Sequence, residues 1–243
     1  MLWRLTTTEL RKMVDTRAGL ALLGVTELLA LGIVAVQLLA GKPATWTFQA
    51  FFFGALTPLG VLLPVLGVLS VSSEWSQRTA LTTFALVPRR ERVLAAKVLA
   101  ASALAALAVG AGALDATLGN LVAAARPHAN GSWHVTEATF GAALLVMVLY
   151  VLLGVGFGTL LQSSPVAIVV YFVLPTAWTV AGRLVSWLHD WASWLDLSTT
   201  AEPLTRGAWP AGDGWERLAA SVALWVGLPL ALGLVRVLRS EVK

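Results

Sequence analysis

The sequence contains no cysteine, and charged residues make up only 12% of its 243 positions. Without cysteine the chain has no disulfide framework, no thiolate nucleophile and no thiolate metal ligand, and its redox compartment is left open. In soluble domains about a quarter of the residues are charged. This low fraction of charged residues therefore indicates that much of the folded chain is surrounded by an apolar medium and not by water.

Motifs for nucleotide binding and hydrolysis are also missing. No Gly-x-x-x-x-Gly-Lys-Ser/Thr phosphate loop occurs, and the one Gly41-Lys42 pair is followed by Pro43. The three histidines lack His-Glu-x-x-His spacing, and no Gly-x-Ser-x-Gly turn is present. We therefore expect no catalytic residue, metal site or cofactor in this chain, and no ATP-binding site.

What the sequence does contain is apolar residues, at 58% of positions, with a mean hydropathy of +0.79. Apolar runs of about 20 residues recur along the chain, and that length crosses ~30 Å of hydrocarbon as a helix. The sequence predicts an all-α polytopic membrane protein in which residues 1–243 form a single domain. The six predicted spans are Ala18–Leu39, Phe51–Val71, Val93–Leu114 with an extension to Val122, Phe140–Leu161, Val166–Trp187 and Leu218–Val235.

The distribution of basic residues predicts the orientation, because Lys and Arg resist translocation. They gather before span one, between spans two and three, and after span six. We predict that this side and both termini are cytoplasmic, in the plasma (inner) membrane of a bacterium. The 13 Arg against four Lys suggest a GC-rich, actinobacterial-like genome. The net charge of +4 is then a topology signal, and no nucleic-acid partner is indicated.

Tryptophan supports the same assignment, since its ring prefers the headgroup layer. Two tryptophans, Trp3 and Trp75, fall on the predicted inner side. Seven fall on the predicted outer side: Trp46, Trp133, Trp187, Trp191, Trp194, Trp209 and Trp215.

Two segments outside the spans have amphipathic patterns. Residues 1–17 predict a helix lying on the inner surface, although Thr6 and Glu9 interrupt its apolar side. A solvated tail is the alternative for this segment. In the predicted outer segment 188–216, the stretch Trp187–Leu197 predicts a half-inserted helix between spans five and six.

Polar residues inside the spans are few. Glu27 lies near the middle of span one, where an unpaired charge costs a few kcal/mol. Asp115 lies toward the outer end of span three. Both are candidates for a substrate pathway; the alternatives are a protonated or hydrogen-bonded Glu27 at a helix contact, and contact with headgroups for Asp115. The Gly-x-x-x-Gly spacing of Gly154 and Gly158 indicates packing within the protein.

The segment 72–90 between spans two and three is polar and longer than a connection needs. Ser72 or Ser73 can cap a short helix, which places Glu74 in its first turn and Arg78 one turn later. Pro88 would end that helix. We interpret the segment as a helix presented to a cytoplasmic partner; an extended loop without a role is the alternative.

At this point the sequence resembles a known family, the membrane subunits of type-2 ATP-binding-cassette (ABC) exporters. In that family a Glu and an aromatic residue end span two, followed by Gly-Thr, a Thr- or Leu-rich helix, a Pro and basic turn, and a Lys early in span three. The family's Gly is Arg78 here. The matching residues are Glu74, Trp75, Thr79, Thr82, Thr83, Pro88, Arg89, Arg90 and Lys97.

The resemblance implies a permease subunit that pairs with a second permease subunit, identical or related, among membrane lipids. Two copies of a separate ABC ATPase subunit would bind ATP and Mg, and segment 72–90 would be the coupling helix that docks on them. The substrate would be a drug, an antibiotic or a lipid-like amphiphile. The implied coupling residues are Glu74, Trp75, Arg78, Thr79, Leu81, Thr82, Phe84 and Leu86.

Two other functions are compatible with six spans. An ion-coupled secondary transporter could carry protons on Glu27 and Asp115, although no internal repeat supports it. A membrane partner protein that transports nothing is the other.

Overall fold

The computed structural model describes residues 2–77, 79, 87 and 89–239. Over these residues the chain forms helices and no strands. Six segments are long and apolar enough to cross a membrane, which confirms the predicted all-α polytopic class. They are α2 (Arg17–Ala40), α3 (Phe48–Ser76), α5 (Arg90–Ala124), α6 (Glu137–Leu161), α7 (Ser164–Leu184) and the segment from Gly214 to Arg239.

The last of these segments is built from three pieces: α11 (Gly214–Val222), a π-helical turn η3 (Ala223–Gly227) and α12 (Leu228–Arg239). The π-helical turn buries Trp225, whose indole Nε1 donates a hydrogen bond to the Leu195 carbonyl at 2.6 Å. The irregular turn thus joins the sixth span to the segment that follows the fifth.

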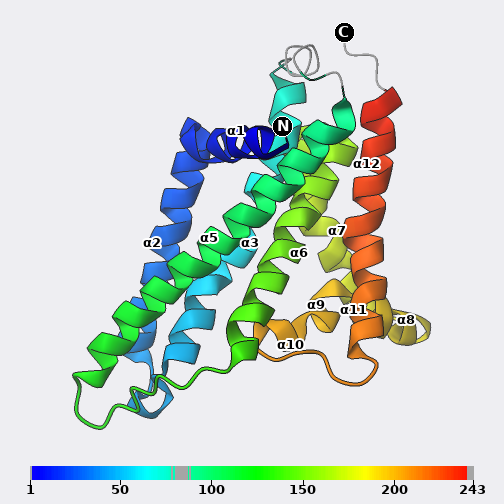
Figure 1. The fold of residues 1–243 in the computed structure, drawn as a ribbon. Coiled ribbons are helices and arrows are strands. Elements are labelled where there is room, and N and C mark those ends of the chain that lie inside the picture. Colours follow the sequence, from blue (N-terminus) through cyan, green and yellow to red (C-terminus); the bar gives the residue numbers. More distant parts are fainter. Residues whose placement is uncertain (1, 78, 80–86, 88, 240–243) are drawn as a thin grey trace.

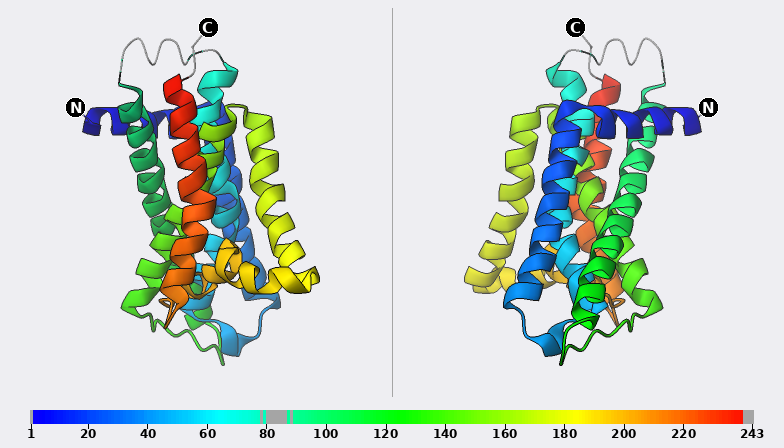
Figure 2. Two further views of the ribbon diagram at one scale, coloured as in Figure 1. Left: turned by 90° about the vertical axis from the view of Figure 1, so that its right-hand side faces the viewer. Right: turned by 90° about the vertical axis from the view of Figure 1, so that its left-hand side faces the viewer.

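The six spans run along one long axis, and α1 (Leu2–Asp15) lies across one end of the bundle (Figures 1 and 2). We call this the basic end; it is defined by Arg17, Arg90, Lys97 and Arg239. The helix predicted for residues 1–17 is therefore present, and its orientation across the spans agrees with a surface helix. The solvated-tail alternative is wrong.

Helices α3 and α6 form the centre of the bundle, because their most apolar windows are each 61% buried against 11% for α7. Glycine allows this contact: a Cβ on Gly154 would lie 2.0 Å from the Pro64 carbonyl oxygen, and one on Gly158 would lie 2.8 Å from that of Val68. The predicted internal packing of this Gly-x-x-x-Gly stretch is confirmed.

Helix α5 has 35 residues and crosses the bundle obliquely (Figure 1). At 1.5 Å per residue it is about 50 Å long, well above the ~30 Å hydrocarbon thickness. The predicted extension of span three beyond Leu114 is confirmed. The second half of α5 packs against α2, since a Cβ on Gly119 would lie 2.6 Å from Val34 Cγ1 and the Arg126 guanidinium donates to the Leu38 carbonyl at 2.8 Å.

The end opposite α1 holds the connections α2–α3, α5–α6 and α7–α11; we call it the tryptophan end, defined by the seven tryptophans predicted for the outer side. Its short helices are η1 (Pro43–Thr45), η2 (Ser186–Leu188), α8 (His189–Leu195), α9 (Leu197–Thr200) and α10 (Glu202–Thr205). Helix α8 confirms the amphipathic helix expected after span five, with Trp191 exposed on it. Buried Asp196 accepts hydrogen bonds from Thr179, Ser198 and Thr199, which ties α7 to α9.

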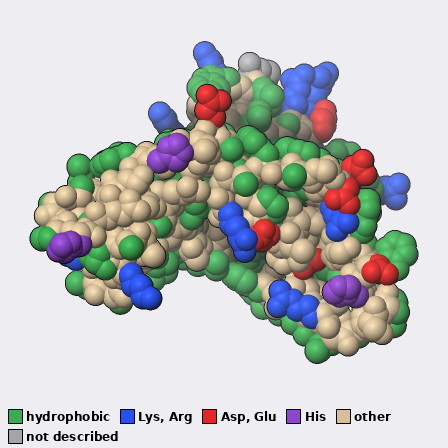
Figure 3. Space-filling model, turned by 90° about the horizontal axis from the view of Figure 1, so that it is seen from below, with side chains coloured by type: hydrophobic (Ala, Val, Ile, Leu, Met, Phe, Trp, Pro, Cys, Tyr) green, Lys and Arg blue, Asp and Glu red, His purple; other side chains and the backbone are tan. Residues whose placement is uncertain are grey.

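Seen from the tryptophan end, the acidic, basic and histidine side chains are scattered among neutral surface (Figure 3). No broad patch of one charge sign is visible on this face.

Candidate functional site

The buried face of α1 carries polar residues. Thr6, Glu9 and Met13 are its buried side chains, whereas Trp3 is exposed. Glu9, which interrupts the apolar side of the sequence pattern, is therefore directed into the protein. Its burial requires a partner of opposite charge.

That partner is Lys97, in the third turn of α5. Its side chain is 3% exposed, and its Nζ lies 2.6 Å from Glu9 Oε2 and 3.1 Å from Glu74 Oε1. Nζ also donates to the Ser70 carbonyl oxygen at 2.7 Å. One buried ammonium thus joins α1, α3 and α5.

Lys12 completes the group from the more exposed side. Its Nζ lies 2.7 Å from Glu9 Oε1 and 3.0 Å from Glu74 Oε1. Partial burial lowers the pKa of Lys12, but hydrogen bonds and charge from Glu9 and Glu74 outweigh it, so the pKa lies above its ordinary 10.5. We call Glu9, Lys12, Glu74 and Lys97 the charge network; it holds two acids and two bases.

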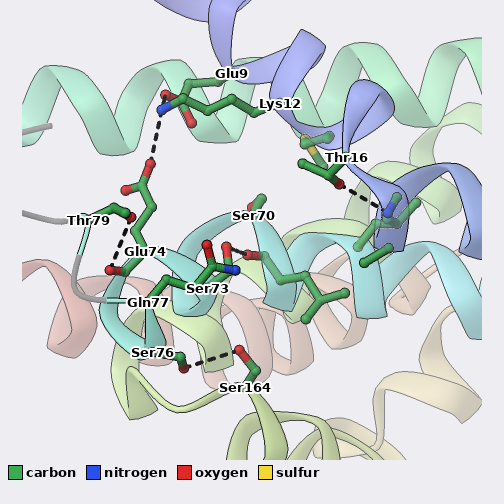
Figure 4. Close-up of a pocket in the computed structure, with 15 residues that line it drawn as sticks. Glu9, Lys12, Thr16, Ser70, Ser73, Glu74, Ser76, Gln77, Thr79 and Ser164 are labelled. Carbon is green, nitrogen blue, oxygen red and sulfur yellow. Dashed lines mark hydrogen bonds and ion pairs between the residues drawn. The ribbon is translucent and has the colours of Figure 1, made fainter.

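A pocket of about 600 Å³ lies beside the charge network, between α1, α3 and the start of α7 (Figure 4). Glu9 and Lys12 line it from α1, and Ser70, Ser73 and Glu74 from α3. On the side of α7, Ser164 approaches Ser76 at 3.5 Å between their hydroxyl oxygens. The pocket therefore lies where the described part of segment 72–90 begins.

The structure corrects the predicted start of the coupling helix. Helix α3 continues unbroken through Ser76, and the Ser72 and Ser73 hydroxyls donate to the Val68 and Leu69 carbonyls inside it. These serines therefore cap no new helix, and Glu74 belongs to the last turns of α3. A backbone turn follows, in which Thr79 N donates to the Glu74 carbonyl at 2.9 Å.

Of the predicted coupling residues, Glu74, Trp75 and Thr79 are described. Trp75 is partly buried in the last turns of α3. Arg78, Leu81, Thr82, Phe84 and Leu86 lie outside the described residues, as do Thr83 and Pro88 of the family pattern. The role of the whole set stays a prediction.

The two predicted pathway residues, Glu27 on α2 and Asp115 on α5, are brought together. Their carboxyl groups interact through a side-chain hydrogen bond and through charge. Asp115 is 3% exposed, and no partner within hydrogen-bond distance of its Oδ2 is found among the described residues. Asp115 is therefore a buried residue of the contact between α2 and α5, and its role in a substrate pathway stays a prediction. We call these two residues the carboxyl pair.

The sequence reasoning singled out neither Glu9 nor Lys12 as a site residue, and it treated Lys97 as a family motif and topology signal. One signal was available for Lys97: a lysine seven residues inside a membrane helix is costly without a partner. Which acid would neutralise it depends on how α1 crosses α5, and the sequence pattern does not contain that angle.

No protein-family model matches this sequence, and no curated protein matches it either. The interpretation of the site therefore depends on the geometry and on the sequence motifs.

Proposed function

We propose that this chain is the permease subunit of an ATP-driven exporter of the type-2 ABC class. The observation that carries the proposal is the charge network, which connects the surface helix α1 to both helices that flank segment 72–90. A protein docked on that segment would act on α3, α5 and α1 together, because the same buried ion pairs join all three.

The sequence supports a separate energy source, because it has no phosphate loop of its own. The order of the motifs from Glu74 to Lys97 supports the same class. In this account ATP and Mg are bound by two ATPase subunits, a second permease subunit completes the pathway, and the basic end is cytoplasmic. The substrate is an amphiphile that enters the pathway from the membrane.

The test is purification of the full chain from its native membrane with an affinity tag. We expect a second chain that carries a phosphate loop to co-purify and the complex to hydrolyse ATP. Replacement of Phe84 by Ala should lower the yield of that chain, since an apolar anchor contributes more to docking than an exposed ion pair. Recovery of the folded permease without any such chain would contradict the proposal.

A second candidate, an ion-coupled secondary transporter, is favoured by one observation, the carboxyl pair in the membrane interior. Liposomes that contain only the purified chain separate the two functions. Uptake driven by a pH gradient without any ATPase would support the second candidate. Uptake that requires both ATP and the ATPase subunit would support the first.

A further inference from the structure

The carboxyl pair brings two acidic groups together with no base to balance them. Asp115 is almost fully buried, no described residue donates a hydrogen bond to its Oδ2, and the Glu27 carboxyl interacts with the Asp115 carboxyl through charge and a side-chain hydrogen bond. Two carboxylates in one site of low polarity cannot both ionise without a cation, because their repulsion is weakly screened there. The site therefore needs at least one proton or another cation.

The packing of α2 on α5 holds the two groups in place. A Cβ on Gly119, one turn beyond Asp115, would lie 2.6 Å from Val34 Cγ1 of α2. Val34 is two turns beyond Glu27, on the same side of its helix. The carboxyl pair is thus a feature of a close helix interface and not a chance approach of two mobile surface chains.

No counter-charge reaches the pair from the neighbouring helices. Helix α3 has no titratable residue before Glu74, which belongs to the charge network, and the sixth span has no charged residue between Arg217 and Arg236. The titratable residue in the middle of α6, Tyr150, lies beside Gly60 of α3. The acidic and basic groups of α1 lie at the basic end, as does Lys97. The two carboxyl groups are therefore each other's only charged neighbours among the described residues.

A metal ion fits this site poorly. Calcium and magnesium take six or more oxygen ligands, and the described residues contain no group of three or more acidic, His or Cys side chains that could hold a metal. A hydrated ion would also have to leave water and cross apolar surface to reach the pair. An organic cation with a shielded charge has neither requirement.

The route to Glu27 is apolar. Glu27 is only half-buried, its neighbour Leu28 is 71% exposed, and the most apolar window of α2 is only 22% buried. A lipophilic cation that partitions into the bilayer can therefore approach Glu27 along the outer surface of α2. A molecule of this kind supplies the missing positive charge and buries its apolar groups against α2.

We propose that the carboxyl pair is a binding site for lipophilic organic cations, each of which displaces the proton that Glu27 and Asp115 share. On binding, the carboxyl O–H bond breaks, its electron pair stays on the oxygen, and the proton goes to water. The cation takes its place through charge alone, so one proton leaves for each monovalent cation bound. As the substrate class of an exporter this rests on the proposed function; as a binding site it does not.

The test uses the full chain, purified without any ATPase, and tetraphenylphosphonium as the probe. Titration calorimetry in two buffers of different ionisation enthalpy, at the same mildly acidic pH, gives the number of protons exchanged. We expect saturable binding with release of about one proton per cation. Triphenylphosphine oxide, which carries similar rings without charge, should bind at least about tenfold more weakly.

The variants Glu27→Gln and Asp115→Asn should each weaken binding by about tenfold or more and abolish proton release. Glu216→Gln and Asp190→Asn are matched controls on the exposed tryptophan end, and both should bind as the parent does. Circular dichroism and gel filtration show that each variant is folded. Absence of saturable binding, binding without proton release, or equal binding by the Glu27→Gln and Asp115→Asn variants and the parent would overturn the proposal.

A second measurement needs no substitution. Dicyclohexylcarbodiimide reacts with protonated carboxyl groups in apolar surroundings, and mass spectrometry can locate the adduct. We expect labelling at Glu27 or Asp115 that tetraphenylphosphonium suppresses and triphenylphosphine oxide does not. Labelling that the cation leaves unchanged would overturn the proposal. Failure to recover an ATPase partner would overturn the proposed function and leave this result intact.

Discussion

The two groups of charged residues in this protein differ in one respect, their balance. The charge network contains two acids and two bases, with all four side chains within 3.1 Å of an opposite charge. The carboxyl pair contains two acids and no base. A buried group with equal numbers of acids and bases can hold helices together. A buried group with only acids requires a proton or another cation that the chain does not supply.

The largest effect is expected from Lys97→Met, which leaves Glu9 and Glu74 with only the half-exposed Lys12. Loss of one partner from a buried ion pair costs about 3 to 5 kcal/mol, because the remaining charge stays buried without compensation. Thermal unfolding in detergent should show a large decrease in Tm or no folded protein. Lys42→Met, at an exposed position of the tryptophan end, is the control. A Tm equal to that of the control would show that the charge network does not hold α1, α3 and α5 together.

A smaller loss of stability, with a specific loss of coupling, is expected from Glu74→Gln. The amide keeps the size of the side chain and removes the charge that faces Lys12 and Lys97. Relative to the parent, the reconstituted complex should hydrolyse more ATP for each substrate molecule transported. Glu91→Gln, exposed in the first turn of α5, is the matched control. If the complex that carries Glu74→Gln hydrolyses the same amount of ATP per transported molecule as the parent, Glu74 has no role in coupling.

At the carboxyl pair we expect the change in the free energy of unfolding to have the opposite sign. Asp115→Asn removes one acid from a site that has too many, so the free energy of unfolding should stay the same or rise by about 1 kcal/mol. The measurement is thermal unfolding beside Lys97→Met under identical conditions. A loss as large as that of the lysine variant would remove the distinction between the two groups.

The smallest effect is expected from Lys12→Met, because exposed ion pairs contribute about 0 to 1 kcal/mol. The folded protein raises the pKa of Lys12 above 10.5, so its contribution is fully present below that pH and is lost as the pH rises through the folded pKa. Unfolding curves of the parent and the variant should differ slightly at neutral pH and converge in strong alkali. A difference that persists at the highest pH would indicate a role for Lys12 other than its charge.

The sequence predicts the six spans well, because length and apolarity decide whether a helix can cross a bilayer. It also predicts α1 and α8, whose amphipathic patterns are visible over two or more turns. The sequence does not predict the two sites. Glu9 contacts Lys97, and Glu27 contacts Asp115, only because of the way their helices cross in the folded protein. Asp115 illustrates this: its place in the sequence suggests the headgroup region, yet the length and tilt of α5 place it beside Glu27.

The capping prediction at Ser72 and Ser73 failed for a local reason. Serine is a good N-cap, but its hydroxyl can also donate to the carbonyl four residues earlier, and both serines do so in the continuous α3. Burial of Val68 and Val71 against the bundle favours continuation of the apolar helix over a break. Tertiary packing thus overrode a local preference.

The most direct test of the proposed function is transport by the purified complex in liposomes, with ATP and a pH gradient supplied separately. The proposal predicts uptake of tetraphenylphosphonium into inside-out vesicles only when ATP and the phosphate-loop subunit are both present, and less uptake for each ATP hydrolysed in Glu74→Gln. Uptake by the permease alone, driven by the pH gradient, would contradict it.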